Sequence, residues 1–99
     1  MINAKQEFLT AVGNTENIIC AYINHHDKGK FNLKVNHTDK ELESFLQEID
    51  FKYDDGYGEQ ELFGTIWLKN GDWIEREDYD GSEYWVYKYV PNIPKKLRK

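Results

Sequence analysis

Three histidines lie close together in the N-terminal third of the chain, and metal binding is the first chemistry that they suggest. His25 and His26 are adjacent, and His37 follows them. Adjacent residues of an extended strand point to opposite faces, so His25 and His26 converge on one ion only at a sharp turn. The sequence contains no second Cys or His cluster with the spacing of a structural zinc site. We interpret the three as turn residues and expect neither a metal nor a cofactor.

Acidic loops around Gly56 and Gly81 are candidates for calcium binding. An EF-hand loop has Asp at its first position, Gly at its sixth and a bidentate Glu at its twelfth. Placing Gly56 sixth puts Phe51 first, and placing Gly81 sixth puts Arg76 first and Tyr87 twelfth. Neither loop fits. A weak cation site is left open, but a solvated acidic face explains these residues better.

Nucleophilic catalysis requires a thiol or hydroxyl beside a base. Cys20 lies within the most apolar segment, and we interpret it as a small core residue. Ser44 and Ser82 fall on a helix exterior and in a turn. Glu75 and Glu77 share one face of a predicted strand and have the residue type for acid–base work, but surface acids with this spacing are common. We therefore expect no enzyme.

Phosphate and nucleic-acid binding have equally little support. The segment Gly56-Tyr57-Gly58 has neither the third glycine nor the strand and helix of a dinucleotide-binding turn. A direct nucleic-acid binder has a basic stripe across an aromatic sheet. In this chain the basic residues are concentrated at 95–99 and the aromatic region is acidic. We do not expect direct contact with nucleic acid.

The composition defines the class of protein. The chain has 99 residues, of which 15% are aromatic, and this length predicts a single domain over 1–99. Cys20 is the only cysteine, which excludes an intramolecular disulfide and favours a cytoplasmic protein. No apolar run reaches the length of a signal peptide or a membrane span, so we expect no membrane association.

Charge is distributed unevenly along the chain. The net charge of −5 divides into +1 for residues 1–38, −11 for 39–83 and +5 for 84–99. Such segregation bears on partners and solubility rather than on fold. Residues 91–99, which begin Pro91-Asn92-Ile93-Pro94, are predicted to form an extended basic tail.

Two helices are predicted. Asn3 caps a helix that runs to about Val12 and ends at Gly13-Asn14. Thr38-Asp39-Lys40-Glu41 is a capping box. The apolar residues after it recur at helical spacing, namely Leu42, Phe45, Leu46 and Ile49.

The remaining elements are predicted strands. Residues 17–24 are predicted to be covered on both faces, and 31–35 to return antiparallel. Residues 50–53 form a short edge strand. Three further strands over 62–69, 72–78 and 84–90 are joined by turns at Asn70-Gly71 and Asp80-Gly81. The fold class is therefore α+β, an antiparallel sheet of four to six strands with two helices packed on it.

A two-residue turn at Asn70-Gly71 predicts that Leu68 pairs with Trp73 and Trp67 with Ile74. Continuing through Asp80-Gly81 places Ile74 opposite Tyr87 and Arg76 opposite Trp85. This register also places Asp78 opposite Glu83, an unfavourable pair that favours a longer turn or bulge there. One face then carries Phe63, Thr65, Trp67, Ile74, Arg76, Trp85 and Tyr87, and the other carries Gly64, Ile66, Leu68, Trp73, Glu75, Tyr84, Val86 and Lys88. Because two helices cannot cover both faces, one aromatic face is expected to be partly open.

The segments 63–68, 72–76 and 79–85 together carry a Gly-Thr-Ile-Trp, Trp-x-Glu-Arg and Tyr-Asp-Gly-Ser-Glu-Tyr-Trp pattern, closed by Pro-x-Ile-Pro. This pattern resembles small accessory proteins of bacteriophages and prophages to which no activity is assigned. The resemblance covers about residues 17–97, and Tyr84 stands where those proteins have Trp. It implies a bacterial host cell and a role such as inhibition of a host defence system, but no catalytic residue.

Together these observations predict a non-enzymatic protein that binds a host protein, such as a nucleic-acid-processing complex of CRISPR or restriction type, through an acidic, aromatic surface. Two alternatives are left open. The aromatic face could bind a small molecule or nucleotide, or it could be the interface of a homodimer. The predicted partner-binding residues are Asp54, Asp55, Tyr57, Glu59, Glu61, Glu75, Arg76, Glu77, Asp78, Asp80, Glu83 and Trp85.

Overall fold

The computed structural model describes residues 1–54 and 58–97. These residues form a five-stranded antiparallel sheet, a two-stranded sheet and two α-helices, in agreement with the predicted α+β class. The elements follow the order β1 (Ile2–Asn3), α1 (Ala4–Val12), β2 (Ile18–His25), β3 (Gly29–Leu33), α2 (Asp39–Glu48), β4 (Lys52–Tyr53), β5 (Leu62–Leu68), β6 (Trp73–Tyr79) and β7 (Ser82–Lys88). Short 3₁₀ turns occupy Thr15–Asn17 and Lys95–Leu97.

Both helices begin where their capping residues predict. The Asn3 side chain accepts a hydrogen bond from the backbone N–H of Gln6, and α1 ends at Gly13, whose φ is 75°. Thr38 and Glu41 form the complete capping box of α2. Within the described part of the chain, neither helix is long and apolar enough to cross a membrane.

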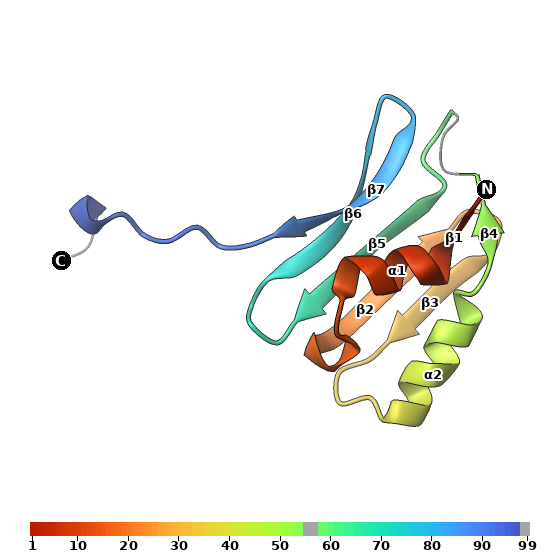
Figure 1. Cartoon of the computed structure of the whole chain (residues 1–99), viewed down its shortest axis with the longest axis horizontal. Helices are drawn as coiled ribbons and strands as arrows, with labels where there is room; N and C mark the ends of the chain where they lie inside the picture. The colour runs from red at the N-terminus through yellow and green to blue at the C-terminus, as the bar shows by residue number, and fades with distance from the viewer. Residues whose placement is uncertain (55–57, 98–99) are drawn as a thin grey trace.

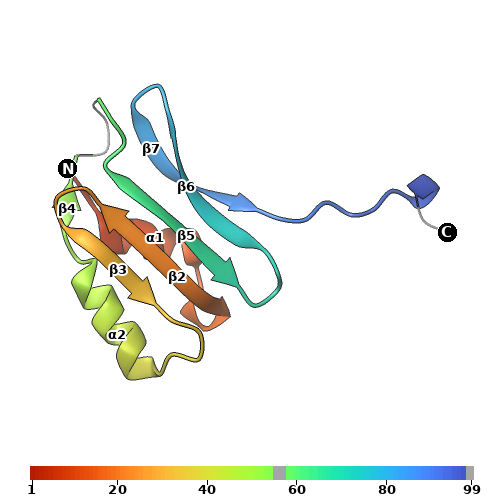
Figure 2. The ribbon, with the colours of Figure 1, turned by 180° about the vertical axis from the view of Figure 1, so that it is seen from behind.

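The larger sheet has the strand order β3-β2-β5-β6-β7, and both helices lie on one side of it (Figure 1). The view from behind shows the opposite side of the sheet with no helix in front of it (Figure 2). The small sheet pairs β1 with β4, and the N–H of Ala4 donates to the carbonyl of Phe51 at 2.9 Å. These links hold the start of α1 beside the segment that follows α2.

The turn between β5 and β6 is one residue longer than predicted, and this corrects the register. The N–H of Gly71 donates to the carbonyl of Leu68, and the N–H of Leu68 donates to the carbonyl of Asp72, each at 3.0 Å. Gly71 has a φ of 92°, so the loop is a three-residue turn with glycine in the left-handed position. Trp67 consequently pairs with Trp73, and Ile66 pairs with Ile74. The predicted grouping of β5 with the other strands is therefore wrong, because a shift of one residue exchanges the faces of a strand.

The turn between β6 and β7 is the two-residue turn that Asp80-Gly81 predicts. Both residues have positive φ, 53° and 87°, as this mirror-image turn requires. Arg76 pairs with Trp85 as predicted. The expected bulge at Asp78 and Glu83 is absent, since these two residues pair directly.

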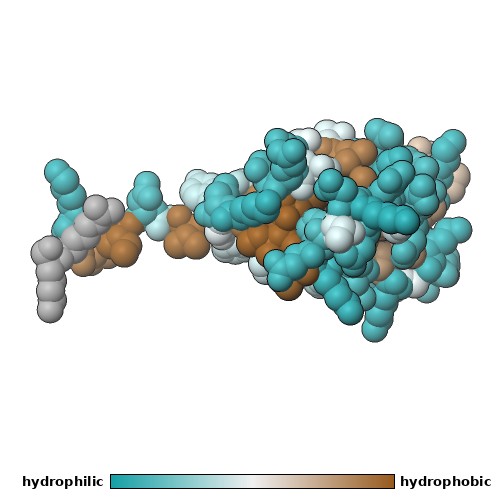
Figure 3. All heavy atoms as spheres, turned by 90° about the horizontal axis from the view of Figure 1, so that it is seen from below, coloured by the Kyte–Doolittle hydropathy of each residue, from teal (hydrophilic) through white to brown (hydrophobic). Residues whose placement is uncertain are grey.

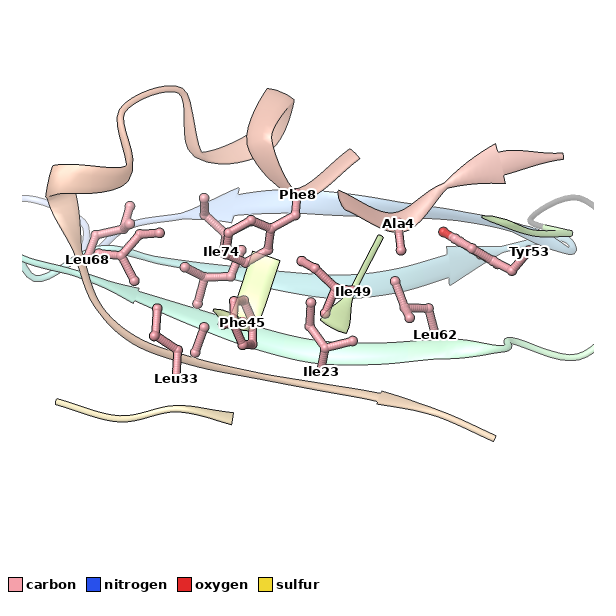
Figure 4. Packing of buried hydrophobic residues seen from close by; sticks show 13 residues of the cluster. Ala4, Phe8, Ile23, Leu33, Phe45, Ile49, Tyr53, Leu62, Leu68 and Ile74 are labelled. Carbon is pink, nitrogen blue, oxygen red and sulfur yellow. The ribbon is translucent and has the colours of Figure 1, made fainter. Parts of the chain in front are cut away.

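The core lies between the helices and the covered face of the sheet (Figure 4). Phe8 of α1 meets Phe45 of α2 edge to face, with ring centroids 5.5 Å apart. Gly64 of β5 lies beneath Trp85, where a Cβ would come within 3.0 Å of the indole and 2.6 Å of the Tyr22 carbonyl oxygen. The buried apolar residues of this cluster are Ala4, Phe8, Ile18, Ala21, Ile23, Leu33, Phe45, Ile49, Tyr53, Leu62, Ile66, Leu68 and Ile74.

The strand predicted to be covered on both faces is open on one. Tyr22 is 40% exposed and Ile19 is 36% exposed, whereas Ala21 and Ile23 are buried. Cys20 is half-buried and pairs with Trp67, so its predicted place in the core is also wrong. β2 is an interior strand between β3 and β5, and only one of its faces is covered.

Residues 89–97 extend away from the body of the molecule beyond the end of β7 (Figure 1). The radius of gyration is 15.1 Å, compared with about 13 Å for a compact chain of this length. We call residues 89–97 the tail.

Candidate interaction surface

The uncovered side of the five-stranded sheet, which we call the open face, carries a group of large aromatic side chains. Trp67 and Phe63 are each 42% exposed, and Tyr22 and Tyr84 are each 40% exposed. The ring centroids of Tyr22 and Trp67 lie 6.2 Å apart, and Trp67 pairs across the strands with Trp73. Rings at such positions are held by a rigid backbone and contribute large contact area with little loss of side-chain entropy.

Register explains why these rings gather. Along β2, β5, β6 and β7 the side chains alternate, so that every second residue faces the helices and the residues between them face solvent. Successive cross-strand pairs join Cys20 to Trp67, Trp67 to Trp73 and Trp73 to Lys88. A parallel row joins Tyr22 to Thr65, Thr65 to Glu75 and Glu75 to Val86. The aromatic residues therefore occupy neighbouring rows of one face.

One border of the open face is charged. Nζ of Lys88 lies 3.2 Å from Oε2 of Glu75 and 2.5 Å from Oε2 of Glu77. Hydrogen bonds to Glu77 and then to Glu75 raise the pKa of Lys88. The hydrogen bond from Lys88 and the one from the Trp73 indole lower the pKa of Glu75. Glu75 and Lys88 are therefore charged at neutral pH, and the bond to Glu75 fixes the orientation of the Trp73 ring.

Exposed carboxylates gather at one end of the sheet, where three connections meet. The N–H of His26 in the β2–β3 turn donates to the carbonyl of Glu61 at 3.4 Å. The N–H of Glu61 in turn donates to Oε2 of Glu83 at 2.7 Å. These bonds hold the turns and the start of β5 together. We call the exposed acids of these connections the acidic end, consisting of Asp27, Asp54, Glu59, Asp78 and Asp80.

Three predicted surface residues lie on the covered face instead. Arg76 is 7% exposed and Glu83 is 6% exposed, and Trp85 is half-buried. Glu75 and Glu77 are on the open face, Glu61 is half-buried beside His25, and Asp55 and Tyr57 lie outside the described residues. The predicted set is therefore divided between the two faces and one end of the sheet.

Arg76 is the centre of a buried polar network that sequence reasoning did not find. Its guanidinium donates to Oε2 of Glu7 at 3.1 Å and to Oε1 of Glu83 at 3.4 Å, and also to the Tyr53 hydroxyl. The carbon Cζ lies 5.8 Å from the Tyr53 ring centroid and 5.4 Å from that of Trp85. The Tyr53 hydroxyl donates to Glu7.

The protonation state of this network follows from its burial. Burial, and then the hydrogen bond to Glu7, raise the pKa of Tyr53 above its ordinary value. The phenol is therefore neutral and serves as a donor. The only sequence signal for this network is Arg76 on an otherwise apolar strand face; nothing local connects it to Glu7 or Tyr53.

The histidine pair is the one group in the described part of the chain with close metal-ligating atoms. Suitable atoms of His25, His26 and Asp27 lie within 4.8 Å of one another. Nδ1 of His25 accepts from the N–H groups of Asp27 and Lys28, at 3.1 and 3.2 Å. Its proton is thus on Nε2, which leaves no free lone pair for a metal. The two imidazole rings are also stacked, with an interplanar angle of 16°, so their in-plane lone pairs do not converge.

Comparisons with protein-family models, curated proteins and solved structures find no match to this chain.

Proposed function

We propose that this chain is a small, non-enzymatic binding protein that contacts a host protein through the open face. The observation that carries the proposal is the exposure of Tyr22, Phe63, Trp67 and Tyr84, each by 40–42%, on a side of the sheet that neither helix covers. Contiguous exposed rings of this kind are typical of protein interfaces, where Trp and Tyr contribute most of the affinity.

The acidic end determines the kind of partner that fits. Its carboxylates lie at one end of the same sheet, so a partner seated on the rings brings its own border residues close to them. A basic partner, such as the nucleic-acid channel of a host nuclease, is attracted by these charges. Nucleotides fit less well, because their phosphates are repelled by the same carboxylates. The resemblance to phage accessory proteins supplies the context of host-defence inhibition, which remains part of the proposal.

The buried network supports a binding role over a catalytic one. Hydrogen bonds link the side chains of Arg76, Glu7, Tyr53 and Glu83. Glu83 also accepts hydrogen bonds from the backbone N–H groups of Glu61 and Leu62. Groups that bond to one another in this way connect the elements of a fold. We therefore assign these four side chains a structural role, the joining of α1, β4, β6 and β7, and not a catalytic one.

The test is capture of a partner from bacterial lysate, followed by calorimetry with the purified partner. Phe63→Ala and Trp67→Ala are expected to weaken binding at least about tenfold each, as hot-spot truncations do. Val35→Ala is the matched control, because Val35 is 56% exposed but lies between β3 and α2. Unchanged affinity in both aromatic variants would contradict the proposal.

Three further measurements test the acidic end and separate the alternatives. Asp78→Asn combined with Asp80→Asn is expected to weaken binding and to flatten its salt dependence. A nucleotide-binding module would instead gain thermal stability from added nucleotides. A homodimer that uses the open face would lose its self-association in Trp67→Ala without any partner being present.

A further inference from the structure

A second candidate surface lies on the opposite side of the molecule from the open face. Helix α1 and strand β7 border a groove of about 410 Å³, lined by Ile2, Gln6, Glu7, Thr10, Ala11 and Trp85. Ile2, Ala11 and the Trp85 indole give it apolar walls. β7 is an edge strand of the five-stranded sheet. The groove is thus an apolar, aromatic-lined hollow beside a sheet edge.

The wall of this groove carries an uncompensated negative charge. Among the residues that the structure describes, Glu7 and Glu83 share one cation, Arg76, whose side chain is fully buried. The Glu7 side chain is 14% exposed, whereas that of Glu83 is 2% exposed. The excess charge of two carboxylates over one guanidinium is therefore accessible on the groove side, through Glu7. An apolar groove with one carboxylate favours a ligand that combines apolar groups with a positive charge.

The tail has this combination of properties. Tyr89, Val90, Ile93 and Leu97 are 66%, 70%, 59% and 69% exposed, so they contact little of the body. Lys95 and Lys96 follow directly after Pro94. The space-filling view shows apolar and polar residues of the tail projecting clear of the molecule (Figure 3).

The two prolines make the tail suited to such a groove. Pro91 and Pro94 fix φ near the polyproline II value and remove two backbone donors, which keeps the segment extended. With three residues per turn, both prolines lie on the same side of a polyproline II helix. Segments with this proline spacing dock into aromatic-lined grooves, since little conformational entropy is lost on binding.

Charge and the direction of the tail point to a second copy of this chain as the occupant of the groove. Trp85 belongs to the strand that leads into the tail, and the tail of the same copy departs away from the body at the end of that strand (Figure 1). Residues 84–99 carry +5, whereas the preceding residues carry −10 in total. We propose that two copies exchange tails, each placing Pro91–Pro94 against Trp85 and Ala11 of the other and a lysine near Glu7.

This arrangement leaves the open face free. The exchange is reciprocal, so it produces a closed two-fold dimer with two equivalent contacts. The proposal is independent of the proposed function, because it uses the other side of the molecule and needs no host partner.

Sedimentation equilibrium of the full chain at low salt tests the exchange. A dimer is expected, with a dissociation constant that rises as salt screens the lysine–carboxylate attraction. Lys95→Glu combined with Lys96→Glu is expected to raise the dissociation constant at least about tenfold. Lys30→Glu combined with Lys40→Glu is the matched control, because it makes the same change in net charge elsewhere. A full chain that is monomeric at every concentration would overturn the proposal.

A groove variant separates the groove from other contacts. Thr10→Arg places a cation on the exposed rim of the groove and is expected to weaken the dimer as much as the tail variant does. Gln47→Arg adds the same charge on an exposed position of α2 and is expected to leave the dimer intact. A dimer that is insensitive to Thr10→Arg would refute the groove as the docking site.

A synthetic peptide of residues 89–97 gives an independent readout. Added to the isotopically labelled full chain, it is expected to compete for the groove, dissociate the dimer and shift the amide signals of Gln6 and Thr10 together with the indole signal of Trp85. Shifts confined to Tyr22 and Trp67 would place the tail on the open face and overturn the groove assignment.

Discussion

Nη2 of Arg76 lies 3.4 Å from Oε1 of Glu83, and both side chains are almost completely removed from solvent. The Glu83 carboxylate also accepts hydrogen bonds from the backbone N–H groups of Glu61 and Leu62, with N···O distances of 2.7 and 3.0 Å. This carboxylate therefore joins β7 to the start of β5 across the intervening strand. The pair holds together the end of the sheet where the acidic connections meet.

Arg76→Met is expected to lower the free energy of unfolding by about 3–5 kcal/mol, because it leaves the buried Glu83 carboxylate and the partly buried Glu7 carboxylate without a cation. Urea denaturation at neutral pH measures this loss. Lys69→Met, which removes an exposed cation, is the control and should change stability by less than about 0.5 kcal/mol. A loss of less than about 1 kcal/mol for Arg76→Met would show that water relaxes the network.

The stability of the protein is expected to fall as the pH decreases from about 7 to about 5. Burial first, and then the neighbouring His26, lower the pKa of His25 below its ordinary value of 6.5. The unfolded chain therefore takes up a proton below pH 6.5 that the folded chain resists, so acid favours unfolding.

Urea denaturation across this pH range checks the assignment to His25. His25→Gln is expected to be less stable at neutral pH, because it loses the acceptor for Asp27 and Lys28, but to depend less steeply on pH. His26→Gln should reduce the slope only in part, because it removes the second cause of the lowered pKa of His25 and leaves the first, burial, in place. Equal slopes in the wild type and His25→Gln would assign the pH dependence to other groups.

Gly64→Ala is expected to destabilise the sheet by about 1–3 kcal/mol, the usual cost of overpacking. The new Cβ would lie 2.6 Å from the Tyr22 carbonyl oxygen and 3.0 Å from the Trp85 indole. Thermal unfolding measures the effect. Adding Trp85→Leu relieves only the contact with the ring, so the double variant should remain destabilised. Wild-type stability in Gly64→Ala would mean that the two strands move apart at little cost.

Asp80→Asn should leave the stability within about 0.5 kcal/mol of the wild type, because asparagine tolerates the φ of 53° at this turn position. Asp80→Val is expected to destabilise the β6–β7 hairpin by about 1–2 kcal/mol, since a β-branched residue is strained there. Amide hydrogen exchange of β7 residues reports the loss locally. Equal protection in the two variants would contradict the turn assignment.

The local features of the fold could be predicted from residues near one another in the chain. The capping residues Asn3 and Thr38 begin the two helices as expected, since their hydrogen bonds reach only three residues ahead. Asp80-Gly81 forms the expected two-residue turn for the same reason. The α+β class follows from such local signals together with the alternation of apolar residues.

Tertiary structure decided which side chains share a surface. A single additional turn residue before Asp72 reversed the faces of β5, so Trp67 lies beside Trp73 on the open face and Arg76 faces the core. The Arg76 network joins Glu7, Tyr53 and Glu83, which are far apart in the sequence, and its formation depends on how the helices pack on the sheet. Sequence patterns specify periodicity within an element, whereas register between strands and contacts between layers depend on geometry that no local pattern encodes.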